Sequence, residues 1–219
     1  MIAVIGTPRL QGQGPDADVA GLAASIAAAA AGAGSRVELV GKVGDDPAGD
    51  TVLLALARHQ VGHVATLRDP ARMTPIVTVV DDPADLDIDV DANAAPDATD
   101  TSSQAPAAPP VLEAADVSLA MRYLPELAVI VTVHVAPEVV AEAVAAAGWA
   151  RTGLIVVVDP AADPPEVLPA GALALAIADH DELGPGAGAA IGRYAAALDR
   201  GEPADAAYAE LKATGTTPA

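Results

Sequence analysis

The chain contains no cysteine and no phenylalanine, and its aromatic residues are three tyrosines and one tryptophan. Without cysteine it has no disulfide framework, thiolate nucleophile or cysteine-ligated zinc site, which agrees with a reducing compartment. Without phenylalanine, the core has to be built from Ala, Val, Leu and Ile. Hydrophobic residues make up 52% of the chain, far above the share found in disordered sequences, so we expect a globular fold.

Basic residues are also scarce, because 11 Lys and Arg stand against 30 Asp and Glu and give a net charge of −19. Such a surface repels phosphate backbones, and the few aromatic side chains provide no base-stacking platform, so we expect no nucleic-acid partner. No stretch is apolar enough to cross a bilayer, and the amino terminus lacks the positive flank of a signal peptide. We therefore expect a cytoplasmic protein that does not associate with membranes.

Short apolar runs that end at Gly or Asp predict buried parallel strands, and apolar residues at helical spacing predict the helices between them. The predicted strands are 2–5, 36–40, 76–80, 127–133, 154–158 and an apolar run at 172–178, with an acidic edge strand at 85–91. The predicted helices are 19–31, with Asp18 as its cap, 51–59, 137–147, a helix from the Gly-rich turn at 184–189 to 198, and 204–212.

This alternation favours an α/β fold, a doubly wound and mostly parallel sheet with helices on both faces. We expect a single domain over residues 1–219, with a mobile loop rich in Pro, Asp and Ala at about 94–110. The alternating carboxylates at 85–91 could collect a cation, but a solvated edge that resists strand pairing explains them better.

The Gly-rich turn is the segment that most suggests a function. Residues without a Cβ let backbone N–H groups approach an anion at the positive end of a helix dipole. An ordinary turn between a loop and a helix explains the same residues, and the lysine of a Walker A loop is absent. On spacing alone, both interpretations stay open.

A motif earlier in the chain, Val43-Gly-Asp-Asp-Pro-Ala-Gly49, follows a strand and precedes a helix. Together with Asp91-Ala-Asn-Ala94, the strand and loop at 156–161 and the Gly-rich turn, it resembles the ribokinase (PfkB-type) carbohydrate kinase family. The resemblance implies a ribokinase-like fold and transfer of phosphate from ATP, with Mg²⁺, to a sugar or nucleoside hydroxyl. It implies substrate contacts at Gly21, Ser25, Gly44 and Asp45, an anion hole at Gly186, Ala187 and Gly188, and a metal or phosphate contact at Glu182.

Several positions depart from the family pattern. The family's Gly-Ala-Gly-Asp reads Gly186-Ala187-Gly188-Ala189, so the carboxylate that would act as the base is missing. General-base catalysis contributes roughly 10²- to 10⁴-fold to a rate. An expected Asn is Ser25, an expected sugar-binding Asp falls near Gln11, and His134 or Val135 replaces another carboxylate. The stretch 6–19 is too short for the usual lid hairpins, so we expect a reduced or absent lid.

The chain is also shorter than its relatives, in one of two ways. In the first, a segment between the strand at 154–158 and the Gly-rich turn is missing. In the second, Asp179-His-Asp-Glu182 matches the family's Asn-x-x-Glu, and the nucleotide-binding half that follows this motif in the family is absent. Both predict a defective nucleotide site.

We therefore expect a protein of this family without phosphotransfer activity. Its scaffold would serve small-molecule or anion binding, or assembly, with a homodimer as the expected state. The alternative is an active ATP-dependent kinase for a sugar, nucleoside or related alcohol, with Asp181 or Glu182 as its base.

Overall fold

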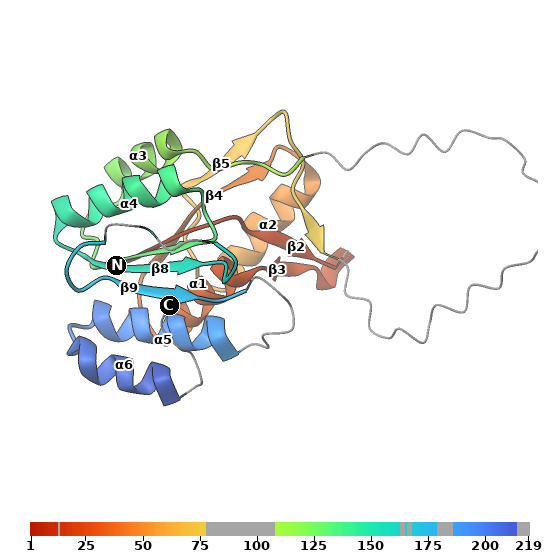
Figure 1. Cartoon of the computed structure of the whole chain (residues 1–219). Coiled ribbons are helices and arrows are strands. Elements are labelled where there is room, and N and C mark those ends of the chain that lie inside the picture. The colour runs from red at the N-terminus through yellow and green to blue at the C-terminus, as the bar shows by residue number, and fades with distance from the viewer. Residues whose placement is uncertain (13, 78–107, 163–164, 166–167, 179–185, 214–219) are drawn as a thin grey trace, which may run out of the picture.

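The computed structural model describes residues 1–12, 14–77, 108–162, 165, 168–178 and 186–213 (Figure 1). Its main sheet has six parallel strands in the order β5-β4-β1-β7-β8-β9. In chain order these strands are β1 (Ile2–Ile5), β4 (Val37–Gly44), β5 (Thr66–Asp69), β7 (Val129–Val133), β8 (Gly153–Val158) and β9 (Leu173–Ala176).

The central strands are buried on both faces. Every residue of β1 and β7 is buried, and Ile2 pairs with Val37 on one side and with Val129 on the other. A parallel sheet covered on both faces requires apolar side chains in both directions, which produces the continuous apolar runs seen in the sequence. The predicted strands at the centre of the sheet are therefore confirmed.

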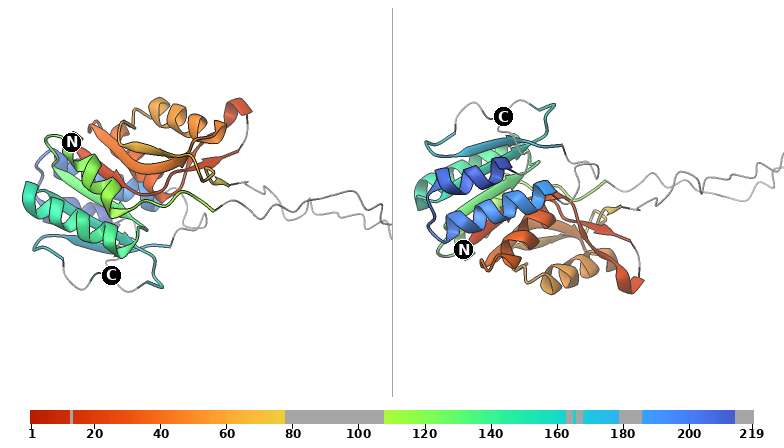
Figure 2. Two further views of the ribbon diagram at one scale, coloured as in Figure 1. Left: turned by 90° about the horizontal axis from the view of Figure 1, so that it is seen from above. Right: turned by 90° about the horizontal axis from the view of Figure 1, so that it is seen from below.

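Helices cover both faces of the sheet, as Figure 2 shows from above and below. One apolar layer contains side chains of α1 (Leu22–Gly32), α2 (Pro47–Arg58), α5 (Gly186–Asp199) and α6 (Ala204–Ala213). The other contains side chains of α3 (Ala114–Tyr123) and α4 (Pro137–Ala150). This arrangement confirms the doubly wound α/β fold.

A second, smaller sheet lies at one end of the main sheet. It consists of β2 (Arg9–Gln11), β3 (Asp18–Ala20) and β6 (Ile76–Val77) in the order β3-β2-β6, with a short 3-10 turn at Gly14–Asp16 between β2 and β3. Strand β2 pairs antiparallel with β3 and parallel with β6. Strands β2 and β3 overlap the stretch 6–19, from which the sequence predicted a reduced or absent lid, and β6 is the described part of the strand predicted at 76–80.

The predicted start of the first helix is wrong. Residues 18–20 pair with β2 as a strand, and Gly21 turns the chain with a φ of 97° before α1 begins at Leu22. Asp18 makes no cap; its carboxylate accepts a hydrogen bond from its neighbour Val19 and lies 2.9 Å from Nε2 of His59. Pairing of residues 18–20 with β2, just before the helix, outweighed the local helix preference of the Ala-rich run.

Helices α1 and α5 pack unusually closely. A Cβ atom added to Gly192 would lie 2.6 Å from the carbonyl oxygen of Ile26, and one added to Gly188 would lie 2.7 Å from Cβ of Ser25. Because the early residues of both helices meet, as do later ones, the helices run parallel, and their amino termini lie together.

Several predictions fall outside the described residues, namely the acidic strand at 85–91, the loop from 94 to 107 and the turn at 184–185. Strand β5 and helix α3 were not predicted. Within the described ranges, no helix combines the length and apolarity that a membrane crossing requires.

Candidate functional site

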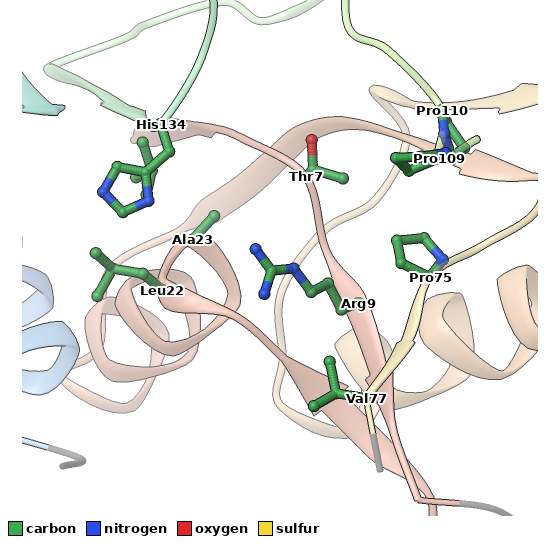
Figure 3. Close-up of a pocket in the computed structure, with 10 residues that line it drawn as sticks. Thr7, Arg9, Leu22, Ala23, Pro75, Val77, Pro109, Pro110 and His134 are labelled. Atoms are coloured by element: carbon green, nitrogen blue, oxygen red, sulfur yellow. The ribbon is translucent and has the colours of Figure 1, made fainter. Parts of the chain in front are cut away.

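The strand order reverses at the centre of the main sheet. From β1 the chain adds β4 and β5 on one side, and later β7, β8 and β9 on the other. In open α/β sheets, ligands bind outside the carboxyl ends of the strands at such a reversal. A cavity of about 490 Å³ lies there (Figure 3), and it is lined by Thr7, Arg9, Leu22, Ala23, Pro75, Val77, Pro109, Pro110, Val133 and His134.

The small sheet forms one wall of this cavity. Arg9 belongs to β2, Val77 belongs to β6, and these neighbouring strands are held together by the pairing of Leu10 with Ile76. In Figure 3 the guanidinium group of Arg9 points toward Leu22 and Ala23, the first residues of α1. The wall that comes from the small sheet thus presents a positive charge to the cavity.

His134 forms part of the opposite wall, directly after β7. Its backbone takes a left-handed conformation, with a φ of 47°, and its N–H donates to the carbonyl of Val157. Its Nε2 lies 2.6 Å from the carbonyl oxygen of Ile177. A carbonyl only accepts hydrogen bonds, so Nε2 carries the hydrogen, and the ring orientation is fixed.

His134 also borders a second cavity, of about 640 Å³, on the side of α4. The walls of this second cavity are mainly aliphatic and come from α4, from the end of β8 and from the loop after it. Its other ionisable lining side chain among the described residues is Asp159.

The residues predicted for the site from the start of α1 and of α5 come together. Gly21 precedes α1, Ser25 lies one turn later with its N–H bonded to the carbonyl of Gly21, and Gly188 is buried against Ser25. Gly186 and Ala187 form the first turn of α5. Leu22 separates this turn from the cavity, since it lines the cavity and its Cδ1 lies 3.5 Å from the Cβ position of Gly188.

Gly44 and Asp45 do not line the cavity. The N–H of Gly44 donates to Oγ1 of Thr74 at 2.9 Å, and Asp45 is exposed and paired with Arg68 at 3.2 Å. The next residue, Asp46, caps α2 by accepting from the N–H of Gly49, and it also accepts from the N–H and hydroxyl of Thr74. These contacts give the motif at 43–49 a turn and capping role.

Ala189 is partly buried in the first turn of α5, beside Gly188. Its methyl group cannot accept a proton, so this position offers no base. Asp181 and Glu182, the other candidates for a base or metal contact, lie outside the described residues. Within the part of the chain that the structure describes, no three His, Asp or Glu side chains are grouped to hold a metal ion.

The sequence assigned no binding role to the two charged or ionisable side chains that the described residues bring to the cavity. Arg9 carried no motif, because its position depends on the pairing of β2 with β6, which are distant in the chain. His134 stood out only as the replacement of an expected carboxylate.

Comparison with solved structures gives the same architecture. The fructokinase with bound ATP from Xylella fastidiosa is similar over 97% of this chain, with a TM-score of 0.51 and 17% identity. A PfkB protein from Polaromonas sp. JS666 is similar over 98% of this chain and 94% of its own, with a TM-score of 0.63 and 13% identity. This chain covers only 65% of the fructokinase.

Among curated protein sequences, none matches this chain significantly. The family model described as pfkB family carbohydrate kinase matches residues 5–216, nearly the whole chain. With the cavity at the strand reversal and the paired amino termini of α1 and α5, this match shows that the chain belongs to the PfkB family of carbohydrate kinases.

Proposed function

We propose that this protein binds a small hydroxylated molecule in the cavity beside Arg9 and does not transfer phosphate to it. The observation that carries the proposal is Ala189, which stands in the first turn of α5 where the family motif has its Asp. Without that base, an attacking hydroxyl keeps its proton, and the loss alone is worth roughly 10²- to 10⁴-fold in rate.

The cavity itself supports retained binding. Its volume of about 490 Å³ falls within the range of small-molecule pockets, and it combines apolar walls with a few polar groups. Thr7 offers a hydroxyl, which suits the oxygens of a polyol.

The amino terminus of α5 supports a second, weaker function, the binding of anions at residues 186–188. Its backbone N–H groups and helix dipole do not depend on the lost carboxylate. ATP would place its phosphates there, and the described residues around it provide no group of carboxylates for Mg²⁺. The net charge of −19 lowers the local anion concentration, so we expect affinities in the millimolar range for inorganic phosphate.

Calorimetric titration with a panel of pentoses and hexoses tests sugar binding. We expect saturable binding that is weakened in Thr7→Val, because this change keeps the shape of the side chain and removes the hydroxyl. Thr51→Val is the matched control, since the hydroxyl of Thr51 bonds only to the carbonyl of Pro47 on the exposed side of α2. Absence of binding to every sugar and sugar derivative would contradict the proposal.

Anion binding at α5 is tested separately, by titrating phosphate while following the amide resonances of residues 186–188. Gly186→Pro removes one N–H donor at a helix position that tolerates proline, so it should reduce the response. Ala189→Asp should reduce it further, because the carboxylate repels the anion by about 4 kcal/mol at 4 Å with an effective dielectric near 20. No saturable shift up to tens of millimolar would mean that the turn is only structural.

A further inference from the structure

The small sheet is attached to the rest of the molecule along α2. Strands β2 and β3 both pack against this helix, as Figure 1 shows. Leu10 of β2 is 5% exposed and belongs to the same apolar cluster as Val52 and Leu56 of α2. Since β2 and β6 form a wall of the cavity at the strand reversal, the contacts with α2 determine how firmly this wall is held.

Polar contacts continue this attachment at the end of α2. Nη2 of Arg58 donates to the carbonyl of Ala17 at 2.6 Å. Nε2 of His59, the residue that follows the helix, lies 3.0 and 2.9 Å from the two carboxylate oxygens of Asp18 in β3. A carboxylate ion only accepts hydrogen bonds, so Nε2 carries the hydrogen in this contact. The contact thus joins the end of α2 to β3.

The carboxylate of Asp18 stays ionised over the range in which a histidine changes its charge. Burial alone would raise the pKa of Asp18, but hydrogen bonds from His59 and from the N–H of Val19 outweigh it and lower the pKa below its ordinary value of 3.8. Histidine side chains change charge between about pH 5 and pH 8. Over this range the contact therefore changes from an ion pair, at low pH, to a hydrogen bond between a carboxylate and a neutral ring.

Two further features act on the charged form of this contact. Arg58 lies 3.8 Å from Oδ1 of Asp18 and shares the carboxylate with His59. The carbonyl groups at the end of α2 interact favourably with a positive charge. Other charged side chains of the elements around the ring lie elsewhere, namely Arg9 at the cavity, Asp16 in an exposed turn, Glu38 against Gly62, Lys42 with Asp116 and Asp50 with Arg68.

From these contacts we infer that Asp18 and His59 form a pH-sensitive attachment, which holds the small sheet more firmly to α2 when His59 is protonated. The added stabilisation is present at low pH and is lost as the pH rises and the ring loses its proton. Both side chains are about half exposed, so the expected effect is a two- to fivefold change, about that of a surface ion pair, in how often the small sheet separates from α2. The inference is independent of the proposed function, because it requires no ligand.

Amide hydrogen exchange in the intact protein measures this separation. The N–H groups of Leu10 and Gly12 donate to carbonyls of Pro75 and Val77 within the small sheet. Three short strands are marginally stable without apolar support, so these amides exchange when the sheet leaves α2. After correction for intrinsic exchange, we expect their protection to be about two- to fivefold higher at pH 5.5 than at pH 8, relative to the amide of Gly6, which bonds to β4 in the main sheet.

Four variants assign the effect. His59→Gln keeps a hydrogen-bond donor and cannot titrate, so it should remove the pH dependence, and Asp18→Asn should do the same. Arg58→Gln should lower the protection by a similar factor at both pH values, because its bond to the carbonyl of Ala17 does not titrate in this range. His63→Gln is the matched control and should keep the pH dependence, since His63 lies in the turn before β5. A pH dependence that persists in His59→Gln, or is lost in His63→Gln, would overturn the inference.

A measurement on the unmodified protein covers the case in which a variant does not fold. The ring resonances of His59 are followed through the same pH range, and the midpoint of their titration should coincide with the midpoint of the change in protection of Leu10. The change should also shrink in about 1 M salt, which screens exposed charges. Equal protection at pH 5.5 and pH 8, or a midpoint that follows another histidine, would contradict the inference.

Discussion

At the scale of single residues, Asp46 explains why the motif at 43–49 has its sequence. One carboxylate caps α2 through Gly49 and holds the backbone and hydroxyl of Thr74 at 2.7 and 2.9 Å. Asp46→Ala should lower the free energy of unfolding by about 1–3 kcal/mol, because it removes a helix cap and leaves the buried Thr74 without its partner. Urea denaturation measures the change.

Asp45→Ala is the control for this prediction. Its carboxylate meets Arg68 on the surface, so the expected change is below about 0.5 kcal/mol. Equal losses in the two variants would mean that the capping contacts do not stabilise the fold.

The same carboxylate predicts a pH dependence. Burial alone would raise the pKa of Asp46, but hydrogen bonds from Thr74 and Gly49 outweigh it and lower the pKa below its ordinary value of 3.8. The stabilisation is therefore complete well above pH 3.8 and is lost as the pH falls through the lowered pKa. The stability difference between the protein and Asp46→Asn should shrink on acidification below pH 4; a difference that grows there would refute this assignment.

At the scale of secondary-structure elements, the contact between α1 and α5 depends on glycine. A Cβ at position 192 would meet the carbonyl oxygen of Ile26 at 2.6 Å and Cβ of Ala29 at 2.7 Å. Because the backbone of α1 cannot move aside cheaply, Gly192→Ala should lower the free energy of unfolding by about 1–3 kcal/mol.

Gly148→Ala is the matched control in another helix, since nothing lies within 4 Å of its Cβ position. There the change should stabilise the protein by about 0.5–1 kcal/mol, through the higher helix propensity of alanine. Thermal or urea unfolding of both variants checks the pair, and a neutral Gly192→Ala would show that the helices lie further apart than described.

The sequence predicted those elements whose environment is apolar on all sides. Strands β1, β7 and β8 have continuous apolar runs because helices cover both of their faces. Strand β5, with Thr66, Arg68 and Asp69, was missed because it is an edge strand and carries polar side chains. The start of α1 was misplaced because only the pairing of β3 with β2 reveals it.

The residues of the candidate site were likewise predicted from the sequence only in part. The family pattern placed Gly21 and Ser25 in one segment and Gly188 in a distant one, and the structure brings the two segments together. Arg9 could not be predicted, because nothing local marks it, and its position depends on the pairing of β2 with β6, a strand more than 60 residues later in the chain. Contacts between remote segments are not visible in periodicity or composition.

At the scale of the whole molecule, the small sheet leaves apolar side chains in contact with solvent. Ile76 in its edge strand β6 is 49% exposed, and nearby in the chain Met73 is 54% exposed. Because side chains alternate along a strand and Val77 lines the cavity, Ile76 faces the other way. We predict that two copies associate through this face of the small sheet.

Light scattering at micromolar concentration should therefore give the mass of a dimer, and Ile76→Lys should give a monomer. Leu119→Lys, on the exposed side of α3, should leave the dimer intact. A monomer in the unmodified protein, or a dimer lost only in Leu119→Lys, would rule out this interface.

Membership of the PfkB family favours phosphate transfer, whereas the proposed loss of the base at Ala189 predicts that none occurs. One assay distinguishes the two. ADP release is measured with ATP, Mg²⁺ and each sugar, sugar acid, sugar phosphate or nucleoside of a panel at saturating concentration. We predict that no compound raises ADP release above the rate without it, even where calorimetry shows binding. Substrate-dependent ADP release that is lost in Gly186→Pro would contradict it and would establish an active kinase with a different base.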